Sequence, residues 1–550
     1  MNQASRKDFV PTNYGALTTL VTVFFFWGFI AAGNSIFIPF CKHRFALDQF
    51  QSQLVDFAFY TAYYVGALVL FVIGSVSGKD LVGKWGLKKS IVFGLLFSAL
   101  GAAVMIIAVN ANTFAGMLGG LFIVALGFSL QQTGAQPFTI ALGDPATGNS
   151  RVNLGGGVNS FGTMIGPLLV AFALFGTAAN ITDDQIIALP LSKVVILYSA
   201  IGALFIAAAA LLGLSKKVPA GISDEPIEHA NKALRTLLVI TGLLLVVFVP
   251  LFNTYRNAEA SSHQLEIERM YLLFAALSIV VVGLLLSYRS ATKAAEGWGA
   301  MRYPQLVLGM LAIFVYVGVE VAIGSNLSEL LRQKEFGEYS ASHVAPFISM
   351  FWGSLMIGRW TGAINAFDMQ RSIKKLLTFV VPLIAFSLIL GTNFVAGKDV
   401  QPLLWYIICV LLQIAAFYVC DDKPARTMLV FGIAGIATML LGLLTTGTVA
   451  VYAFLSGGLC CSIMWPSIFA LAIAGLGKYT TQGSAFLIMM ILGGGIIPPL
   501  QGKLSDILGI HYSFIVPVFC FSYLALFGFL VRGVLSRQGI DCDQTAAAAH

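Results

Sequence analysis

The sequence predicts an all-α protein that crosses a membrane many times, and three observations lead to this fold class. Of its 550 residues, 58% are hydrophobic and 10% are charged, against roughly 25% charged in ordinary soluble domains. The apolar residues fall in runs of about 20, the length with which a helix spans a bilayer. Glycine, which lets membrane helices approach closely, contributes 56 residues. This composition excludes a water-soluble domain and a disordered chain, and a β-barrel would alternate over segments of about 10 residues.

Sixteen apolar segments are long enough to be spans, each with boundaries uncertain by about 2–4 residues. Short polar loops separate them, and the longest linker runs from Ser215 to Arg235, too short for a soluble domain. The predicted spans are 14–40, 53–77, 90–109, 114–142, 152–177, 192–214, 234–252, 271–288, 304–328, 344–366, 375–395, 402–420, 427–446, 449–475, 482–503 and 511–533.

A repeated pattern of proline and glycine indicates that the spans form two related halves. Pro137 and Pro167 are 30 residues apart, and Pro466 and Pro498 are 32 apart, each pair joining a Pro-containing helix to a Gly-rich one. Parallel repeats of six helices around a central cavity are the plan of major facilitator transporters. The alternative is a chance recurrence of Pro and Gly. We predict two six-helix bundles plus about four extra transmembrane helices: a bundle at 14–214, a linker at 215–303 with two extra helices, and a bundle at 304–533 that includes two more at about 375–420.

The distribution of basic residues predicts the orientation. With 32 Lys and Arg against 25 Asp and Glu the net charge is +7, and the basic residues lie between spans, where they indicate sidedness rather than a nucleic-acid partner. Alternate loops are rich in lysine, as at Lys88-Lys89 and Lys216-Lys217, and the others lean acidic, as at Asp183-Asp184. Lys42-His43-Arg44 is the exception. We expect a multi-pass protein of the cell inner (plasma) membrane with both termini cytoplasmic.

Several motifs, in order along the chain, resemble the fucose permease family of the major facilitator superfamily. The first half carries Phe25-Phe26-Trp27-Gly28, Gln132-Thr133-Gly134-Ala135-Gln136-Pro137-Phe138 and Arg151-Val152-Asn153-Leu154. The second half carries Tyr316-Val317-Gly318-Val319-Glu320, Ile357-Gly358-Arg359-Trp360-Thr361-Gly362 and Met464-Trp465-Pro466. The second-half set is most similar to the glucose/galactose branch. The resemblance implies a 12-helix sugar symporter, and it leaves four of the sixteen spans without a counterpart.

Polar side chains within the spans are the candidate substrate ligands. Sugar hydroxyls must exchange water for protein partners, and amides offer donors and acceptors together. Gln132 and Gln136 are four residues apart and share a helical face; the alternative is ordinary hydrogen bonding between helices. The predicted substrate-binding set is Asn34, Gln132, Gln136, Asn159, Glu320, Asn326 and Trp352.

The coupling ion is less clear from the sequence. The resemblance implies proton-linked acids at positions that here hold Ser35 and Gln132, and neither titrates near neutral pH. Glu320 lies mid-helix, where an ionised carboxylate costs roughly 2.5–3.5 kcal/mol and normally faces a cavity or a partner. Glu320 and Asp56 are therefore the candidate coupling residues for H⁺ or Na⁺. Arg359 is predicted to act in gating by pairing with an acid, or else to snorkel at a helix end.

These features predict a secondary active transporter rather than an enzyme. It is expected to import a monosaccharide, a hexose or 6-deoxyhexose, by alternating access. No nucleotide-binding GxxxxGK[ST] motif occurs, and no cofactor or metal site is indicated. The alternative is a facilitator, or an exchanger or exporter of another polar solute such as an amino sugar or peptidoglycan fragment.

Overall fold

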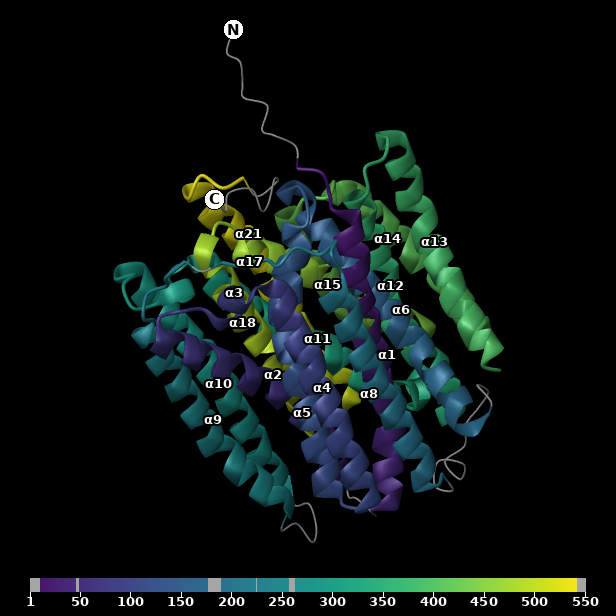
Figure 1. The fold of residues 1–550 in the computed structure, drawn as a ribbon. Coiled ribbons are helices and arrows are strands. Elements are labelled where there is room, and N and C mark those ends of the chain that lie inside the picture. The colour runs from purple at the N-terminus through teal and green to yellow at the C-terminus, as the bar shows by residue number, and fades with distance from the viewer. Residues whose placement is uncertain (1–9, 46–48, 177–188, 224, 257–262, 542–550) are drawn as a thin grey trace.

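The protein is a bundle of long helices that run roughly parallel to one another (Figure 1). The computed structural model describes residues 10–45, 49–176, 189–223, 225–256 and 263–541, without the side chains of 30–44, 49–54, 56, 171, 175, 256, 263, 341 and 342. All regular secondary structure in these ranges is helical. Fourteen described segments are long and apolar enough to cross a membrane. Helices α1, with the apolar stretch Tyr14–Phe29, and α12 account for the other two predicted spans, so the count of sixteen is approximate.

The described residues of the first half form six long helices and one short one. They are α1 (Tyr14–Arg44), α2 (Gln49–Ser77), the short α3 (Leu81–Trp85), α4 (Leu87–Asn110), α5 (Phe114–Ala141), α6 (Gly148–Phe175) and α8 (Leu191–Leu214). Helix α1 packs on α6, and α4 packs between α5 and α8.

The second half repeats this arrangement with two of its helices broken. It consists of α11 (Pro304–Leu331), α12 (Ala341–Ala363), α15 (Pro424–Leu444), α16 (Gly447–Cys461), α17 (Met464–Ile473), α18 (Thr480–Met489), α19 (Gly493–Leu508), the short α20 (Ile510–Ser513) and α21 (Ile515–Arg537). Helix α11 packs on α19 as α1 packs on α6, and α15 packs on α16 and α21 as α4 packs on α5 and α8. The predicted division at 214 and 304 remains a prediction, with α8 ending at Leu214 and α11 beginning at Pro304.

The same close approach between helices occurs in both halves. A Cβ atom on Gly28 would stand 1.9 Å from the carbonyl oxygen of Asn159, and one on Gly493 would stand 1.9 Å from that of Phe314. Only glycine permits backbones to lie so near. The Gly28 contact sets α1 against α6 at the height of Asn159, and it thereby fixes where that amide stands.

Four further helices lie outside the two six-helix units, at the positions expected from the sequence. They are α9 (Asn231–Arg256), α10 (His263–Lys293), α13 (Arg371–Val395) and α14 (Ile407–Cys420). The pairs α9–α10 and α13–α14 lie on opposite flanks of the bundle in Figure 1. Helix α9 packs on α2 and α10 on α11 and α19, and α13 packs on the outside of α12. Because both insertions are even in number, every later helix keeps its direction.

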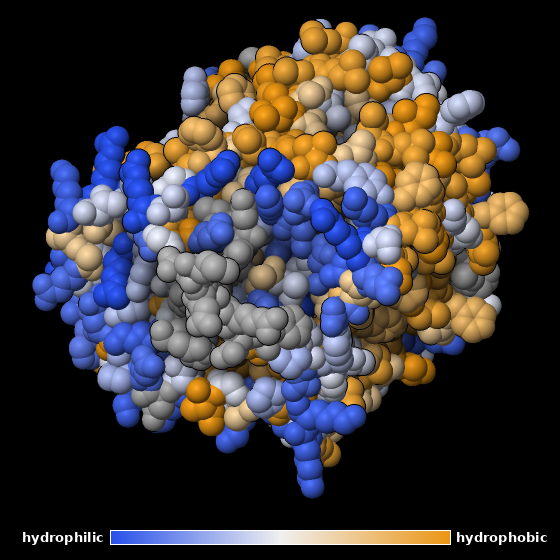
Figure 2. All heavy atoms as spheres, turned by 90° about the horizontal axis from the view of Figure 1, so that it is seen from above, coloured by the Kyte–Doolittle hydropathy of each residue, from blue (hydrophilic) through white to orange (hydrophobic). Residues whose placement is uncertain are grey.

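One end of the bundle carries basic side chains and both ends of the described chain. The start of α1 and the end of α21 lie at the same end, where Tyr14 Oη accepts from the backbone N–H of Asp368 (3.0 Å) and the Gln538 amide donates to Gln305 (2.7 Å). Lys84 of α3 and Lys88 and Lys89 at the start of α4 are at this end as well. Seen from this side, the surface carries many hydrophilic side chains, with apolar side chains around the flank (Figure 2). We refer to it as the basic end.

Candidate functional site

A cavity lies between the two halves near the middle of the helices. Its volume is about 210 Å³, which suits one small polar solute. Glu320 stands 16 residues into α11, on the order of 24 Å from the basic end. The lining residues are Phe24, Trp27, Phe59, Tyr63, Gln132, Gln136, Val152, Gly156, Asn159, Tyr316, Val317, Glu320, Arg359, Trp465, Pro466 and Ile491.

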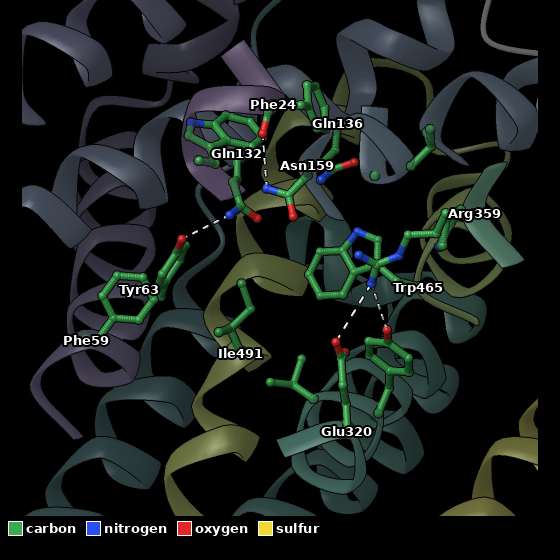
Figure 3. A pocket seen from close by; sticks show the side chains of 16 residues that line it. Phe24, Phe59, Tyr63, Gln132, Gln136, Asn159, Glu320, Arg359, Trp465 and Ile491 are labelled. Carbon is green, nitrogen blue, oxygen red and sulfur yellow. Dashed lines mark hydrogen bonds and ion pairs between the residues drawn. The ribbon is translucent and has the colours of Figure 1, made fainter. Parts of the chain in front are cut away.

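The first half contributes a wall of amides. Gln132 Nε2 donates to Tyr63 Oη at 2.9 Å, and Asn159 Nδ2 donates to the carbonyl oxygen of Phe24 at 3.1 Å. Gln136 is 4% exposed, and its Oε1 atom is buried without a hydrogen-bond partner among the described residues. Gln132 and Asn159 lie on one side of the cavity, and Trp465 and Arg359 lie on the other (Figure 3). This wall therefore presents amide groups, one of them with an unused acceptor, to whatever occupies the cavity.

Aromatic rings border the amides on both sides. Trp27 lies against Phe24 with ring centroids 4.5 Å apart, and its Nε1 donates to the buried side chain of Gln131. Trp465, on α17, faces the cavity from the second half and lies 6.0 Å from the Tyr316 ring. Apolar faces of sugar rings pack well on such rings.

The second half contributes an ion pair. Arg359 Nη2 lies 3.8 Å from Glu320 Oε1, and the two side chains are 11% and 14% exposed. The same nitrogen donates to Tyr316 Oη at 3.2 Å, and Arg359 Nη1 donates to Ser160 Oγ of the first half at 2.8 Å. Figure 3 shows Arg359 and Glu320 on the side of the cavity opposite Gln132. Arg359 therefore joins the two halves through the cavity wall while pairing with its acid.

The structure brings together five of the predicted site residues: Gln132, Gln136, Asn159, Glu320 and Arg359. Asn326 and Trp352 do not line this cavity; the Asn326 amide donates to the backbone of its own helix, and Trp352 packs edge-on against Phe351. The side chains of Asn34 and Asp56 lie outside the described residues. The roles of all these residues remain predictions.

The lining residues that were not in the predicted site set include Tyr63, Tyr316 and Phe59. Tyr316 precedes Glu320 by four residues and so shares its helical face, which is a signal that the sequence contained. Tyr63 and Phe59 carried none, because they belong to an aromatic-rich stretch of α2 in which nothing distinguishes them.

Contacts between the halves close the basic end of the cavity. Asp80, between α2 and α3, accepts from the Thr481 hydroxyl of α18, and Asp422, just before α15, accepts from Ser150 Oγ of α6 at 3.3 Å. The Ser484 hydroxyl donates to the carbonyl oxygen of Thr133 at 2.8 Å. Burial raises the pKa of Asp80 and that of Asp422 to about 6, against an ordinary value of 3.8. Both carboxyls would regain water if this end opened.

The chain is similar to known sugar transporters over nearly its whole length. No family model matches the sequence. A glucose/galactose transporter of Brucella abortus (biovar 1, strain 9-941) is 29% identical over 519 residues, which cover 94% of each chain. An L-fucose-proton symporter of Escherichia coli K12 is 25% identical over 524 residues, 95% of this chain and 93% of the relative. The resemblance to the fucose permease family is confirmed.

The similar solved structures show the fold. The chain superposes on the E. coli fucose:proton symporter with a TM-score of 0.60 at 22% identity, covering 94% of this chain and 99% of that one. The same protein in its outward conformation gives the same score. The chain therefore has the major facilitator fold and is a multi-pass membrane protein, with four helices added to the two six-helix halves.

Proposed function

We propose that this chain imports a monosaccharide by alternating access, coupled to protons. The observation that carries the proposal is the cavity itself, in which an amide wall with an unpartnered Gln136 oxygen faces a buried Arg359–Glu320 pair. Its full-length relatives are named as transporters of glucose and galactose and as symporters of L-fucose with protons. A neutral hexose or 6-deoxyhexose suits amide ligands, aromatic faces and a cavity of about 210 Å³.

In this proposal Glu320 carries the coupling proton. The positions that resemble the family's acids hold Ser35 and Gln132, and among the described residues that line the cavity Glu320 alone has a carboxyl group. The positive charge of Arg359 stabilises the ionised form of Glu320. Protonation of Glu320 would remove the ion pair and leave Arg359 with its hydrogen bonds to Ser160 and Tyr316. Proton binding would then alter a contact that joins the two halves.

The sidedness follows from the basic loops. We place the basic end in the cytoplasm of a cell whose inner membrane holds the protein, because positive loops face inward. Both termini are then cytoplasmic, and the structure is closed on that side. The sugar would enter from the opposite end and leave past Asp80 and Asp422, once their contacts across the halves break.

Uptake into proteoliposomes tests the proposal. Radiolabelled glucose, galactose and L-fucose would each be supplied with a pH gradient, with a Na⁺ gradient, and with neither. We expect at least one of these sugars to accumulate above equilibrium only when the outside is acidic. Entry that merely equilibrates under every gradient would make the protein a facilitator, and the absence of uptake for all hexoses would contradict the sugar assignment.

A further inference from the structure

The face of α6 that packs on α12 carries two buried amides that have an unused acceptor. Asn153 is fully buried and Asn149 is 4% exposed. The Oδ1 atom of each lacks a hydrogen-bond partner among the described residues. Leaving such a group buried and unpaired destabilises a fold, so two of them on one helical face require an explanation.

Asn149 lies between the cavity and the basic end, and Asn153 lies level with the part of the cavity nearest that end. They are four residues apart, hence on one helical face, and Val152 and Gly156 of the same helix line the cavity. Gly156 is eight residues from the start of α6, a length of about 12 Å. A substrate that leaves the cavity along α6 toward the basic end would pass both side chains.

Helix α6 meets α12 of the second half at these residues, along a line of contact that we call the seam. Contacts between the two halves hold the seam closed. A Cβ atom on Gly362 of α12 would stand 2.8 Å from Asn153 Cγ, so that amide is pressed against the partner helix. On either side, Ser150 donates to Asp422 and Trp360 Nε1 donates to the carbonyl oxygen of Gly157 at 3.1 Å. The seam is thus held by neighbours of the two asparagines.

Neither asparagine strengthens this seam with a bond of its own. The Asn153 Nδ2 atom donates to the backbone carbonyl of Asn149, within the same helix, at 3.1 Å. An apolar side chain of the same shape would close the two helices without an unpaired acceptor. The amides therefore destabilise the closed seam, and they would be satisfied once the basic end opens.

We infer that Asn149 and Asn153 form the polar wall of the release path, where their carbonyl oxygens accept from water and from the hydroxyl groups of a neutral sugar as the halves part. This inference rests on the proposed transport function. It makes the two residues specific to the open basic end, distinct from the amides that line the central cavity. They lower the cost of opening and provide the leaving sugar with acceptors.

Two variants with the same substitution, asparagine to leucine, test the inference. Asn153→Leu removes an unpaired acceptor at the seam, whereas Asn393→Leu removes a buried amide of the added helix α13 that donates to Ser349 Oγ of α12 at 2.9 Å. We expect Asn153→Leu to melt no lower than the parent, to keep its sugar-induced thermal shift, and to lose at least tenfold in uptake rate per folded protein. Asn393→Leu should melt lower and keep its uptake rate within twofold. A lowered melting point or uptake within twofold for Asn153→Leu would overturn the inference.

Cysteine labelling separates this inference from the proposed function, because it needs no sugar. Asn153→Cys in vesicles with the basic end outward is treated with a membrane-impermeant maleimide, and the parent with its seven cysteines gives the background. Labelling above background, absent when the reagent reaches only the opposite end, supports the path even if no hexose is transported. An Asn153→Cys protein that is never labelled from the basic end would contradict it.

Discussion

Replacing Glu320 with glutamine removes the proposed proton carrier and keeps its shape. One carboxyl group among the described lining residues of the cavity predicts one proton per sugar. A gradient of one pH unit supplies about 1.36 kcal/mol per proton, which supports roughly tenfold accumulation. Glu320→Gln is expected to bring the accumulation ratio to about one, because glutamine cannot change charge. Exchange of internal for external sugar should persist, since it needs no net proton movement.

The same substitution has a predicted cost in stability. At 3.8 Å and an effective dielectric constant of about 20, the attraction of the pair is on the order of 4 kcal/mol. Breaking a buried pair by removing one partner typically costs about 3–5 kcal/mol. Because Arg359 keeps its hydrogen bonds to Ser160 and Tyr316, we expect Glu320→Gln to lower the free energy of unfolding by about 3 kcal/mol or less.

The assay compares accumulation in proteoliposomes with exchange in the same preparation. The control is Glu329→Gln, the same change on an exposed residue of the same helix, which should accumulate sugar as the parent does. If Glu320→Gln still accumulated sugar tenfold under one pH unit, the proton would be carried elsewhere and the reasoning would fail.

Three further predictions follow from particular contacts. Gln136→Ala removes the unpartnered acceptor and should raise the Kd for sugar at least tenfold in calorimetry; an unchanged Kd would exclude Gln136 as a ligand. Gly28→Ala should lower the melting point by the equivalent of about 1–3 kcal/mol, because its Cβ would clash at 1.9 Å, whereas Gly119→Ala, which has open space, should not. Acidifying the basic side from pH 7 through 6 should favour the closed basic end, because the pKa values of Asp80 and Asp422, about 6 when buried there, fall toward 3.8 on opening; spin-label distances across that end would show the opposite trend if this sign were wrong.

The fold could be predicted almost entirely from the sequence, because a bilayer imposes one length on every span. The four added helices were recognisable for the same reason. What the sequence could not show is that α18 and α19 are joined by a 3-10 turn at Met490–Leu492, which places Ile491 in the cavity wall. An apolar run has the same composition whether the helix within it is continuous or broken.

The site was predictable where a polar residue stands out in an apolar helix, as Glu320 and Gln136 do. Helical phase explains the residues that fall elsewhere. Asn326 follows Glu320 by six residues, about 240° around the helix, and therefore faces away. Trp352 shares a face with Arg359 but lies seven residues away, about 10 Å toward the opposite end.

The closed seam depends on pairs that are distant in the chain and so had no sequence signal. Asp80 and Thr481 are separated by 401 residues, and Ser150 and Asp422 by 272. Only the packing of the two halves brings them together. The unpaired state of Asn149 and Asn153 was equally beyond prediction, because it depends on which neighbours fail to reach them.

The central claim is that the cavity between the halves binds one monosaccharide through the amides of the first half. Its most direct test is a thermal-shift titration of the purified protein with glucose, galactose and L-fucose, because a ligand that binds the folded state raises its apparent stability. We predict a saturable rise with at least one sugar, lost in Gln132→Ala and kept in Glu329→Gln. A rise of equal size and affinity in Gln132→Ala, or no rise with any hexose, would contradict the account.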